Sequence, residues 1–377
     1  MKTIKSTLII LLLILSAGVF AQQTYIYVSD AGGFNNSPWQ IMRYDVDGSN
    51  PQIFIPNTFF VTEGVGWPQD IVFLEDQEVV LISNLVGGRI TKHNATTGAY
   101  IEDFAAVAGG PTRMKIGADD LLYVLQWSNT DNKVLRYEQD GTFVDEFTSV
   151  GVVQSIGLDW DSAGNLYVSS YGGGTVRKFD PSGNDMGLFI DTELSGPTNI
   201  WFNSGGELLV LDWTAGDIER FDASGNYLGT WASGLAQPEG IAELPNGNLL
   251  VGNGGLAQVD QFLPSGTFFE TTVTSGSGGL IQPNAVVLRD AILSTSDYEL
   301  NRILVTPTMG TQFEFTQQAI SHFQEIQIFD VLGTLVDSVS IAEGSIWDAQ
   351  RLSEGIYFMV ATGESGLKTT QKIVVKK

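Results

Sequence analysis

Three sequence markers recur along the chain with a spacing of roughly 42 residues, a period found in repeat proteins built from four-stranded β units. The first is an aromatic residue before a tight turn that ends in Gly, as in residues 179–183 (FDPSG). The second is a short apolar strand, as in 165–168 (NLYV), and the third is a Pro-x-x-apolar entry, as in 197–200 (PTNI). Each marker occurs six times. The sequence therefore predicts six similar β units.

The order of the markers predicts that the two ends of the repeat region complete one unit together. The first copy begins at the apolar strand 25–28 without a Pro-x-x entry, whereas the last entry, 283–286, has no further marker after it. Pairing the two ends removes the exposed sheet edges, which is how a β-propeller seals its ring. The expected fold is all-β, with residues 22–291 forming a six-bladed β-propeller closed by strands from both ends.

The repeat resembles that of NHL-type and related six-bladed β-propellers, whose units carry Pro-x-Gly-Ile, Gly-Asn-Leu-Tyr-Val and Phe-Asp-x-x-Gly segments. The copies nearest to this pattern are 155–158 (SIGL), 164–168 (GNLYV) and 179–183 (FDPSG), then 238–241 (PEGI) and 247–251 (GNLLV). The resemblance implies a fold and leaves the activity open, because such propellers include lactonases, lyases and many proteins that only bind.

One rim of the expected ring gathers polar and aromatic side chains. If each unit runs from inner to outer strand, its second strand ends on the face where its inner strand begins. Aromatic residues there could stack on a sugar or another planar ligand. The alternative is that they pack between blades. The predicted binding residues are Trp127, Tyr171, Trp213, Asp70, Arg113, Asn199 and Glu239.

The same rim contains a candidate metal site. Asp30, Asn84, Asp212 and Asn253 follow the apolar segments of four second strands. Side-chain oxygens are the ligands that Ca²⁺ prefers, so calcium is the candidate cofactor. Because the repeat itself sets the spacing of these residues, polar capping of the strand ends explains them equally well.

The number and position of the histidines argue against a catalytic site in which histidine acts as the general base. The chain contains only His93, on the third strand of a unit, and His322, outside the repeat. Neither histidine is expected at the central channel of the ring, where a catalytic site would lie. A divalent-cation-dependent hydrolase or lactonase that uses only the Asp and Asn ligands stays open as an alternative to a binding role, and no catalytic residue is assigned.

The N-terminus has the pattern of a cleavable secretory signal over residues 1–21. Lys2 and Lys5 precede the apolar run 8–15, and small residues follow before Gln22. A retained N-terminal anchor is the alternative. The run is shorter than the ~20 apolar residues that a membrane span needs, and no later stretch approaches that length. The mature chain is therefore expected to have no transmembrane segment, and without cysteine it forms no disulfides.

The chain is strongly acidic. Its formal net charge of −24 becomes −26 when Lys2 and Lys5 leave with the signal. Such a surface repels nucleic-acid phosphates and anionic lipids, which disfavours both as partners. Divalent cations, glycans, proteins and small ligands remain candidate partners, although solubility alone also explains the charge.

The repeat pattern ends before a linker expected at 292–304, and a different strand pattern follows. Residues 325–336 (EIQIFDVLGTLV) indicate a strand, a Gly turn and a strand, and 352–357 (LSEGIY) and 372–377 (KIVVKK) follow. This set resembles the type A C-terminal sorting domain of the type IX (Por) secretion system, although Thr306-Pro307 stands where that family has Asn-Pro.

The resemblance implies that residues 305–377 form a small β-sandwich recognised by the type IX machinery. An accessory sandwich that binds substrate is the alternative. Together the patterns predict a chain that passes through the periplasm and is then secreted or held at the cell surface, where its propeller binds a ligand or partner.

Overall fold

The computed structural model describes residues 23–290, 304–316, 319–320, 323, 325–340, 346–362 and 368–377. The chain divides into two compact units, Met1–Ala291 and Ile292–Lys377. The expected signal at 1–21, the expected linker up to residue 303 and His322 lie outside the described residues.

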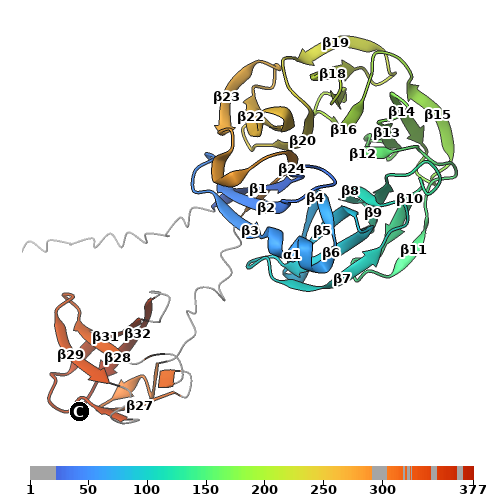
Figure 1. The fold of residues 1–377 in the computed structure, drawn as a ribbon. Helices are drawn as coiled ribbons and strands as arrows, with labels where there is room; N and C mark the ends of the chain where they lie inside the picture. The colour runs from blue at the N-terminus through green and yellow to red at the C-terminus, as the bar shows by residue number, and fades with distance from the viewer. Residues whose placement is uncertain are drawn as a thin grey trace, which may run out of the picture. The chain divides into compact units, whose positions relative to one another are not determined.

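The described part of the first unit contains six four-stranded antiparallel sheets, which lie around a common centre (Figure 1). From the inner to the outer strand, the first sheet is β24 (Pro283–Asp290), β1 (Thr24–Asp30), β2 (Gln40–Asp45) and β3 (Gln52–Ile55). The second is β4 (Gly66–Leu74), β5 (Val79–Val86), β6 (Arg89–Asn94) and β7 (Tyr100–Ala106). The third is β8 (Pro111–Ile116), β9 (Leu122–Gln126), β10 (Val134–Tyr137) and β11 (Phe143–Glu146).

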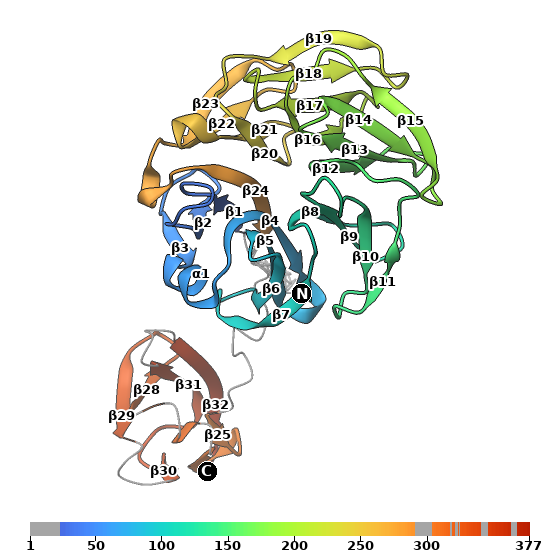
Figure 2. The same cartoon turned by 45° about the vertical axis from the view of Figure 1, so that its right-hand side comes forward.

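The remaining three sheets of this unit follow the same order along the chain, and Figure 2 shows their strands stacked outward from the centre. The fourth is β12 (Ser155–Trp160), β13 (Leu166–Ser170), β14 (Thr175–Phe179) and β15 (Asp185–Ile190). The fifth is β16 (Pro197–Phe202), β17 (Leu208–Asp212), β18 (Asp217–Phe221) and β19 (Tyr227–Ala232). The sixth is β20 (Pro238–Glu243), β21 (Leu249–Asn253), β22 (Gln258–Phe262) and β23 (Phe268–Val273).

The first sheet is built from both ends of the repeat region. The inner strand β24 pairs antiparallel with β1, and Ile26 lies opposite Leu288 and Val28 opposite Val286. The predicted joining of the two ends is therefore present in the structure. The inner strands also touch one another in sequence around the centre, since β24 contacts both β4 and β20.

Neighbouring sheets share hydrophobic clusters. Tyr27 of β1 packs with Ile71 and Val80 of the second sheet, whereas Ile26 and Val28 pack with Leu250 and Val259 of the sixth. Successive side chains of a strand point to opposite faces, so the second strand of this sheet is buried on both sides. Equivalent clusters lie between each other pair of neighbouring sheets.

The tight turns between third and fourth strands depend on Asp and Gly, as their sequence indicates. Asp180 Oδ1 accepts hydrogen bonds from the backbone N–H groups of Ser182 and Asn184, at 2.8 and 2.9 Å. Gly183 has φ +78°, and a Cβ there would lie 2.0 Å from the carbonyl oxygen of Phe147 in the preceding sheet. This turn therefore packs directly on its neighbour and accepts only Gly.

One short helix, α1 (Asn57–Glu63), interrupts the pattern between β3 and β4 and was not expected. Its single buried side chain, Phe60, joins the cluster between the first two sheets. The described part of the first unit also contains three short 3₁₀ turns, η1 (Glu75–Gln77), η2 (Gly254–Leu256) and η3 (Ser277–Gly279).

The described part of the second unit contains two sheets. The strand order of the smaller one is β25 (Val305–Thr306), β27 (Gln312–Phe315) and β30 (Ile346–Asp348). The larger one is β26 (Met309–Gly310), β32 (Lys368–Val375), β31 (Gly355–Thr362), β28 (Glu325–Asp330) and β29 (Leu335–Ser340). Phe313 and Trp347 of the smaller sheet share a core with Ile328 and Met359 of the larger one. The expected strand, Gly turn and strand at 325–336 are β28 and β29.

The pairing of β1 with β24 should carry a large part of the stability of the first unit. Ile26→Ala removes a side chain that is fully buried between the first and sixth sheets. We expect a loss of about 2–5 kcal/mol in the free energy of unfolding, measured with guanidinium chloride. The matched control is Ile53→Ala on β3 of the same sheet, where the side chain is 56% exposed and the expected loss is below about 0.5 kcal/mol. Equal losses would contradict this role of the pairing.

Candidate functional site

Polar side chains at the ends of the second strands hold the loops that lead into the inner strands. Asp30 Oδ1 accepts from the backbone N–H groups of Gly32 and Gln282, at 3.0 and 2.8 Å. Asp212 accepts from the backbone N–H of Ser195 at 2.6 Å and from that of Ala215 at 2.9 Å. Each carboxylate therefore joins the loop after its own strand to the loop before the inner strand of the same sheet.

The two asparagines predicted as metal ligands use their side chains differently. Asn253 Oδ1 accepts from the backbone N–H of Ala236 at 2.8 Å, while its amide donates to Asp260 at 2.7 Å. The amide of Asn84 donates to Thr91 and to two backbone carbonyls. Within the described ranges, no group of three or more His, Cys, Asp or Glu residues could hold a metal ion. The calcium site stays a prediction. Asp30, Asp212 and Asn253 accept backbone N–H groups as capping residues do, whereas the buried Oδ1 of Asn84 has no hydrogen-bond partner in the described part of the chain.

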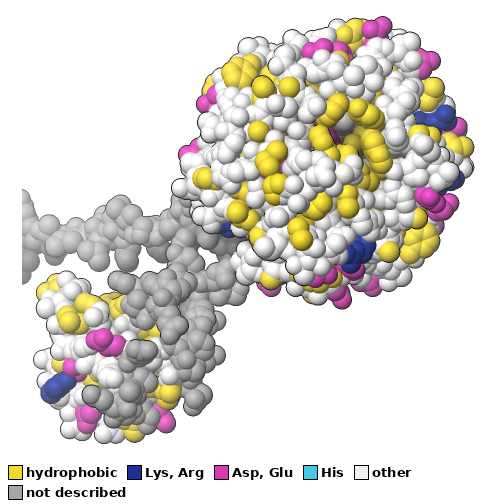
Figure 3. Space-filling model, in the orientation of Figure 1, with side chains coloured by type: hydrophobic (Ala, Val, Ile, Leu, Met, Phe, Trp, Pro, Cys, Tyr) yellow, Lys and Arg dark blue, Asp and Glu magenta, His cyan; other side chains and the backbone are white. Residues whose placement is uncertain are grey.

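The three predicted aromatic residues follow these capping positions and line one pocket. Trp127, Tyr171 and Trp213 come directly after β9, β13 and β17. The pocket has a volume of about 170 Å³, and the side chains around it are those of Phe34, Trp67, Trp127, Ile156, Tyr171, Thr198, Trp213 and Glu239. Figure 3 shows hydrophobic side chains gathered around a hollow at the centre of this face. We call this the mouth pocket.

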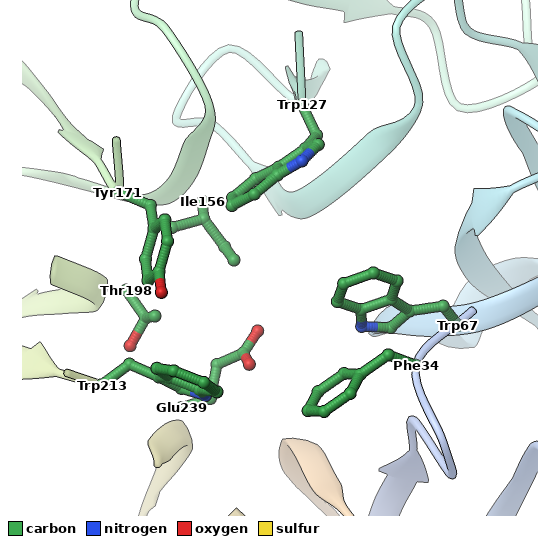
Figure 4. A pocket seen from close by; sticks show the side chains of 8 residues that line it. All are labelled: Phe34, Trp67, Trp127, Ile156, Tyr171, Thr198, Trp213 and Glu239. Atoms are coloured by element: carbon green, nitrogen blue, oxygen red, sulfur yellow. The ribbon is translucent and has the colours of Figure 1, made fainter. Parts of the chain in front are cut away.

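The rings of the mouth pocket stand at angles to one another and surround the pocket (Figure 4). The centroids of Trp127 and Tyr171 are 5.5 Å apart with planes inclined by 41°, and those of Tyr171 and Trp213 are 6.0 Å apart at 80°. All three rings are half-buried. The interpretation that they only pack between blades does not account for their exposure to the pocket.

Two further rings, Phe34 and Trp67, were missed by the sequence analysis. Their centroids lie 5.1 Å apart, and they face the other three rings across the pocket. Phe34 lies in the long loop after β1, and Trp67 immediately precedes the Pro68 entry of β4. The position of Trp67 in the sequence could have revealed it, because Trp67 precedes the proline of an inner strand and therefore belongs to the same rim.

Trp67 is held in an unusual backbone conformation. Its φ of +48° lies in the left-handed region, which a bulky residue adopts only when the surrounding structure imposes it, at a cost of order 1–3 kcal/mol. Its indole Nε1 is also buried and has no hydrogen-bond partner in the described part of the chain. Gln154 and Gln237, which precede the inner strands β12 and β20, have φ of +49° and +57°, so this conformation recurs at strand entries. The feature particular to Trp67 is its unused donor.

A buried ion pair forms the floor of the mouth pocket. The Glu239 side chain is 4% exposed, and its Oε1 accepts from the Arg113 guanidinium at 2.9 Å. Arg113 also donates to the backbone carbonyls of Gln69 and of Asn284, the latter at 2.8 Å. It approaches Asp70 to 3.8 Å. A single arginine on β8 thus joins the inner strands β4, β20 and β24.

Burial is the main influence on the pKa values of Glu239 and Asp70. Desolvation raises the pKa of Glu239 from 4.5 to about 7; the Arg113 charge opposes this rise and the Asp70 charge adds to it. Desolvation also raises the pKa of Asp70, against the Arg113 charge and hydrogen bonds from the Met114 and Ile71 backbone. Two buried carboxyl groups, Glu239 at the mouth pocket and Asp70 beside the second cavity, therefore share the Arg113 charge.

The remaining predicted binding residues line a second cavity. Asp70, Arg113 and Asn199 lie along a space of about 330 Å³ among the inner strands. Asn199 Oδ1 accepts from the backbone N–H of Ile200 at 3.0 Å. The seven predicted binding residues thus divide between two cavities, with Trp127, Tyr171, Trp213 and Glu239 at the mouth pocket.

His93 lies on β6, the third strand of its sheet, as expected. Its ring is buried between Phe59 and Tyr100, and its Nδ1 lies 3.0 Å from the carbonyl oxygen of Gly98. Burial lowers the pKa of His93 to about 4, so the ring is neutral near pH 7. His93 lines neither cavity.

Removing the shared arginine should destabilise the chain in a pH-dependent way. Arg113→Met removes the guanidinium that the two buried carboxyl groups share, and we expect a loss of about 3–5 kcal/mol in the free energy of unfolding at pH 8. The loss should be smaller at pH 5, because protonated Glu239 needs no partner. Arg177→Met is the control, since Arg177 pairs with Asp185 on the surface and its expected loss is about 1 kcal/mol or less. Unfolding curves at both pH values test this, and a pH-independent loss would contradict it.

Comparison with known proteins identifies the second unit and the fold of the first. Residues 308–376 match the family described as the secretion system C-terminal sorting domain. Among solved structures, a chain of the nidogen/laminin complex matches with a TM-score of 0.58 and 14% identity, over 70% of this chain and 98% of that one. A protein of unknown function from Bacteroides caccae matches with a TM-score of 0.56 and 14% identity, over 71% and 99% of the two chains.

No curated protein sequence matches the chain at a significant level. At 14% identity, the two structures establish a likeness of fold only. None of the helices in the described ranges has the length and apolar character needed to cross a bilayer. The sorting domain marks the chain for secretion or for the cell surface by the type IX system and for contact with that machinery. The chain thus joins a first unit of the β-propeller type to a C-terminal domain, at residues 308–376, that belongs to the secretion system sorting family.

Proposed function

We propose that the first unit is a closed six-bladed propeller and that it acts outside the cell as a ligand-binding module. Closure is supported by the hydrophobic clusters that each pair of neighbouring sheets shares, and by the contacts of β24 with both β4 and β20. A ring of this kind has a mouth at its centre, where loops from every sheet meet.

The observation that carries the binding role is the composition of the mouth pocket. Five aromatic rings, each supplied by a different sheet, surround one space above a buried carboxylate. Half-buried aromatic walls with few polar groups are typical of ligand sites. The capping side chains at the strand ends hold the loops that carry these rings, so the walls are formed before a ligand arrives.

The hydrolase alternative receives no specific support. A metal-assisted reaction would require several free oxygen ligands around one point, and Asp30 and Asp212 already accept backbone hydrogen bonds. We therefore place binding ahead of catalysis.

The aromatic walls should be required for ligand binding. The experiment is a ligand-detected NMR screen of small soluble compounds that include neutral sugars, organic anions and organic cations. We expect at least one class to bind, and binding to be lost when Trp127 and Trp213 are both replaced by Ala. Trp160→Ala is the control, because Trp160 is half-buried on β12 but lines neither cavity. Unchanged binding by the Trp127→Ala, Trp213→Ala double variant, or no binding by any class, would contradict the proposal.

For export, we propose that the N-terminal signal, which we place at residues 1–21, leads to the periplasm and that the domain we place at residues 305–377 leads onward across the outer membrane. A chain ending at Asp290, made in a bacterium with a type IX system, should then remain in the periplasmic fraction, whereas the full chain reaches the medium or the cell surface. Fractionation and immunoblotting measure this. As a control, residues 305–377 attached to an unrelated periplasmic protein should confer export. Efficient secretion of the shortened chain would refute the role of the domain.

A further inference from the structure

We propose that the mouth pocket binds an alkylated ammonium group, held between the aromatic walls and the Glu239 carboxylate. This inference rests on the proposed ligand-binding function and specifies the chemical class of the ligand.

The aromatic walls favour a cation. The face of an aromatic ring carries partial negative charge and attracts a cation within about 6 Å, and Trp does so most strongly. Three of the five rings in the mouth pocket are Trp. The ring planes are inclined to one another by 41°, 80° and 59° in the three close pairs. The rings therefore form walls around a rounded group and offer no single flat platform for stacking.

Glu239, on the lining of the pocket, and the charged cluster behind it supply the opposite charge. Glu239 and Asp70 are two carboxyl groups beside the one guanidinium of Arg113. With both ionised, this cluster carries one excess negative charge in a buried place, which is costly without a further partner. A cation seated on Glu239 would supply that partner. In Figure 4 the Glu239 carboxylate reaches toward the space between the rings.

The size and polarity of the pocket limit what the cation can be. Its volume of about 170 Å³ is below the roughly 300–1,000 Å³ of sites for drug-sized ligands, so it suits a head group of a few heavy atoms. The single O–H of Thr198 is already used within the fold, since its Oγ1 lies 3.0 Å from the carbonyl oxygen of Pro238 and 3.3 Å from that of Leu211. A sugar would bury several hydroxyl groups against few polar partners, chiefly Trp67 Nε1 and the Glu239 carboxylate. A quaternary ammonium group has no N–H and therefore no hydrogen bonds to satisfy. The net charge of −24 also draws cations to the molecule.

The ionisation of Glu239 gives the inference a second signature. Arg113 on β8 and Asp70 on β4 act directly on this carboxyl group, and Lys115 on β8 acts on Asp70. Because the pKa of Glu239 is about 7, a proton competes with the bound cation below that pH. The affinity for a quaternary ammonium ion, whose own charge does not titrate, should therefore be about tenfold lower at pH 6 than at pH 8.

The test uses the full chain and calorimetric titration with choline, and with dimethylbutanol, its neutral isostere, as the matched ligand. At pH 8 we expect choline to bind at least tenfold more tightly than dimethylbutanol. Glu239→Gln should lower the affinity for choline at least tenfold and leave the affinity for dimethylbutanol unchanged. Glu243→Gln is the control, because Glu243 is exposed at the other end of the same strand, β20, and this variant should bind like the unmodified chain.

A second variant tests the inference independently if Glu239→Gln fails to fold. Trp127→Leu keeps an apolar wall but removes a ring face, and should lower the affinity for choline about 3- to 30-fold relative to dimethylbutanol. Equal binding of the two ligands, or an affinity for choline that Glu239→Gln leaves unchanged, would overturn the ammonium inference. If another class from the screen then bound through Trp127 and Trp213, the proposed function would stand. If no class of compound bound, both the ammonium inference and the proposed ligand-binding function would be refuted.

Discussion

The first unit depends on the burial of both faces of every sheet. A second strand such as β9, with sequence LYVLQ, is buried at each of its five positions, because alternate side chains enter the clusters on either side. A sheet with two buried faces needs two neighbours, so the series cannot end with a free sheet without exposing a large apolar surface. The pairing of β1 with β24 meets this requirement, since it brings the first and last segments of the repeat into one sheet.

The same arrangement brings functional side chains together at the centre. The capping residues hold the loops at the strand ends, and the residues beside them point to a common space, so groups far apart in sequence become neighbours. Phe34 and Glu239 line one pocket although they come from the first and sixth sheets. Arg113 then joins inner strands across the centre through Glu239 and the carbonyl oxygens of Gln69 and Asn284. Glu239 therefore belongs both to the lining of the mouth pocket and to the charged cluster at the centre of the fold.

The sequence predicted the repeat, the joining of both ends and the three aromatic residues after the second strands, because a period of roughly 42 residues fixes which positions are equivalent. It did not predict Phe34 or Trp67, because Phe34 lies in a long loop after β1 and Trp67 lies one residue before the Pro-x-x entry, at positions that none of the three markers covers. It also could not distinguish a metal ligand from a capping residue. Asp30 and Asp212 have the residue type of calcium ligands, and the backbone hydrogen bonds that they accept become visible only in the structure. The charge balance at Glu239 depends on Arg113, which comes from another sheet, and no local pattern reveals that contact.

The central claim is that the mouth pocket is a preformed site for a small cationic ligand. A crystal structure of the mature protein grown with choline tests it most directly. The account predicts density for one ammonium group between Trp67, Trp127 and Trp213, in contact with the Glu239 carboxylate, and rings that keep the positions they have without the ligand. A pocket that contains only water at saturating choline, or choline bound elsewhere on the molecule, would contradict it.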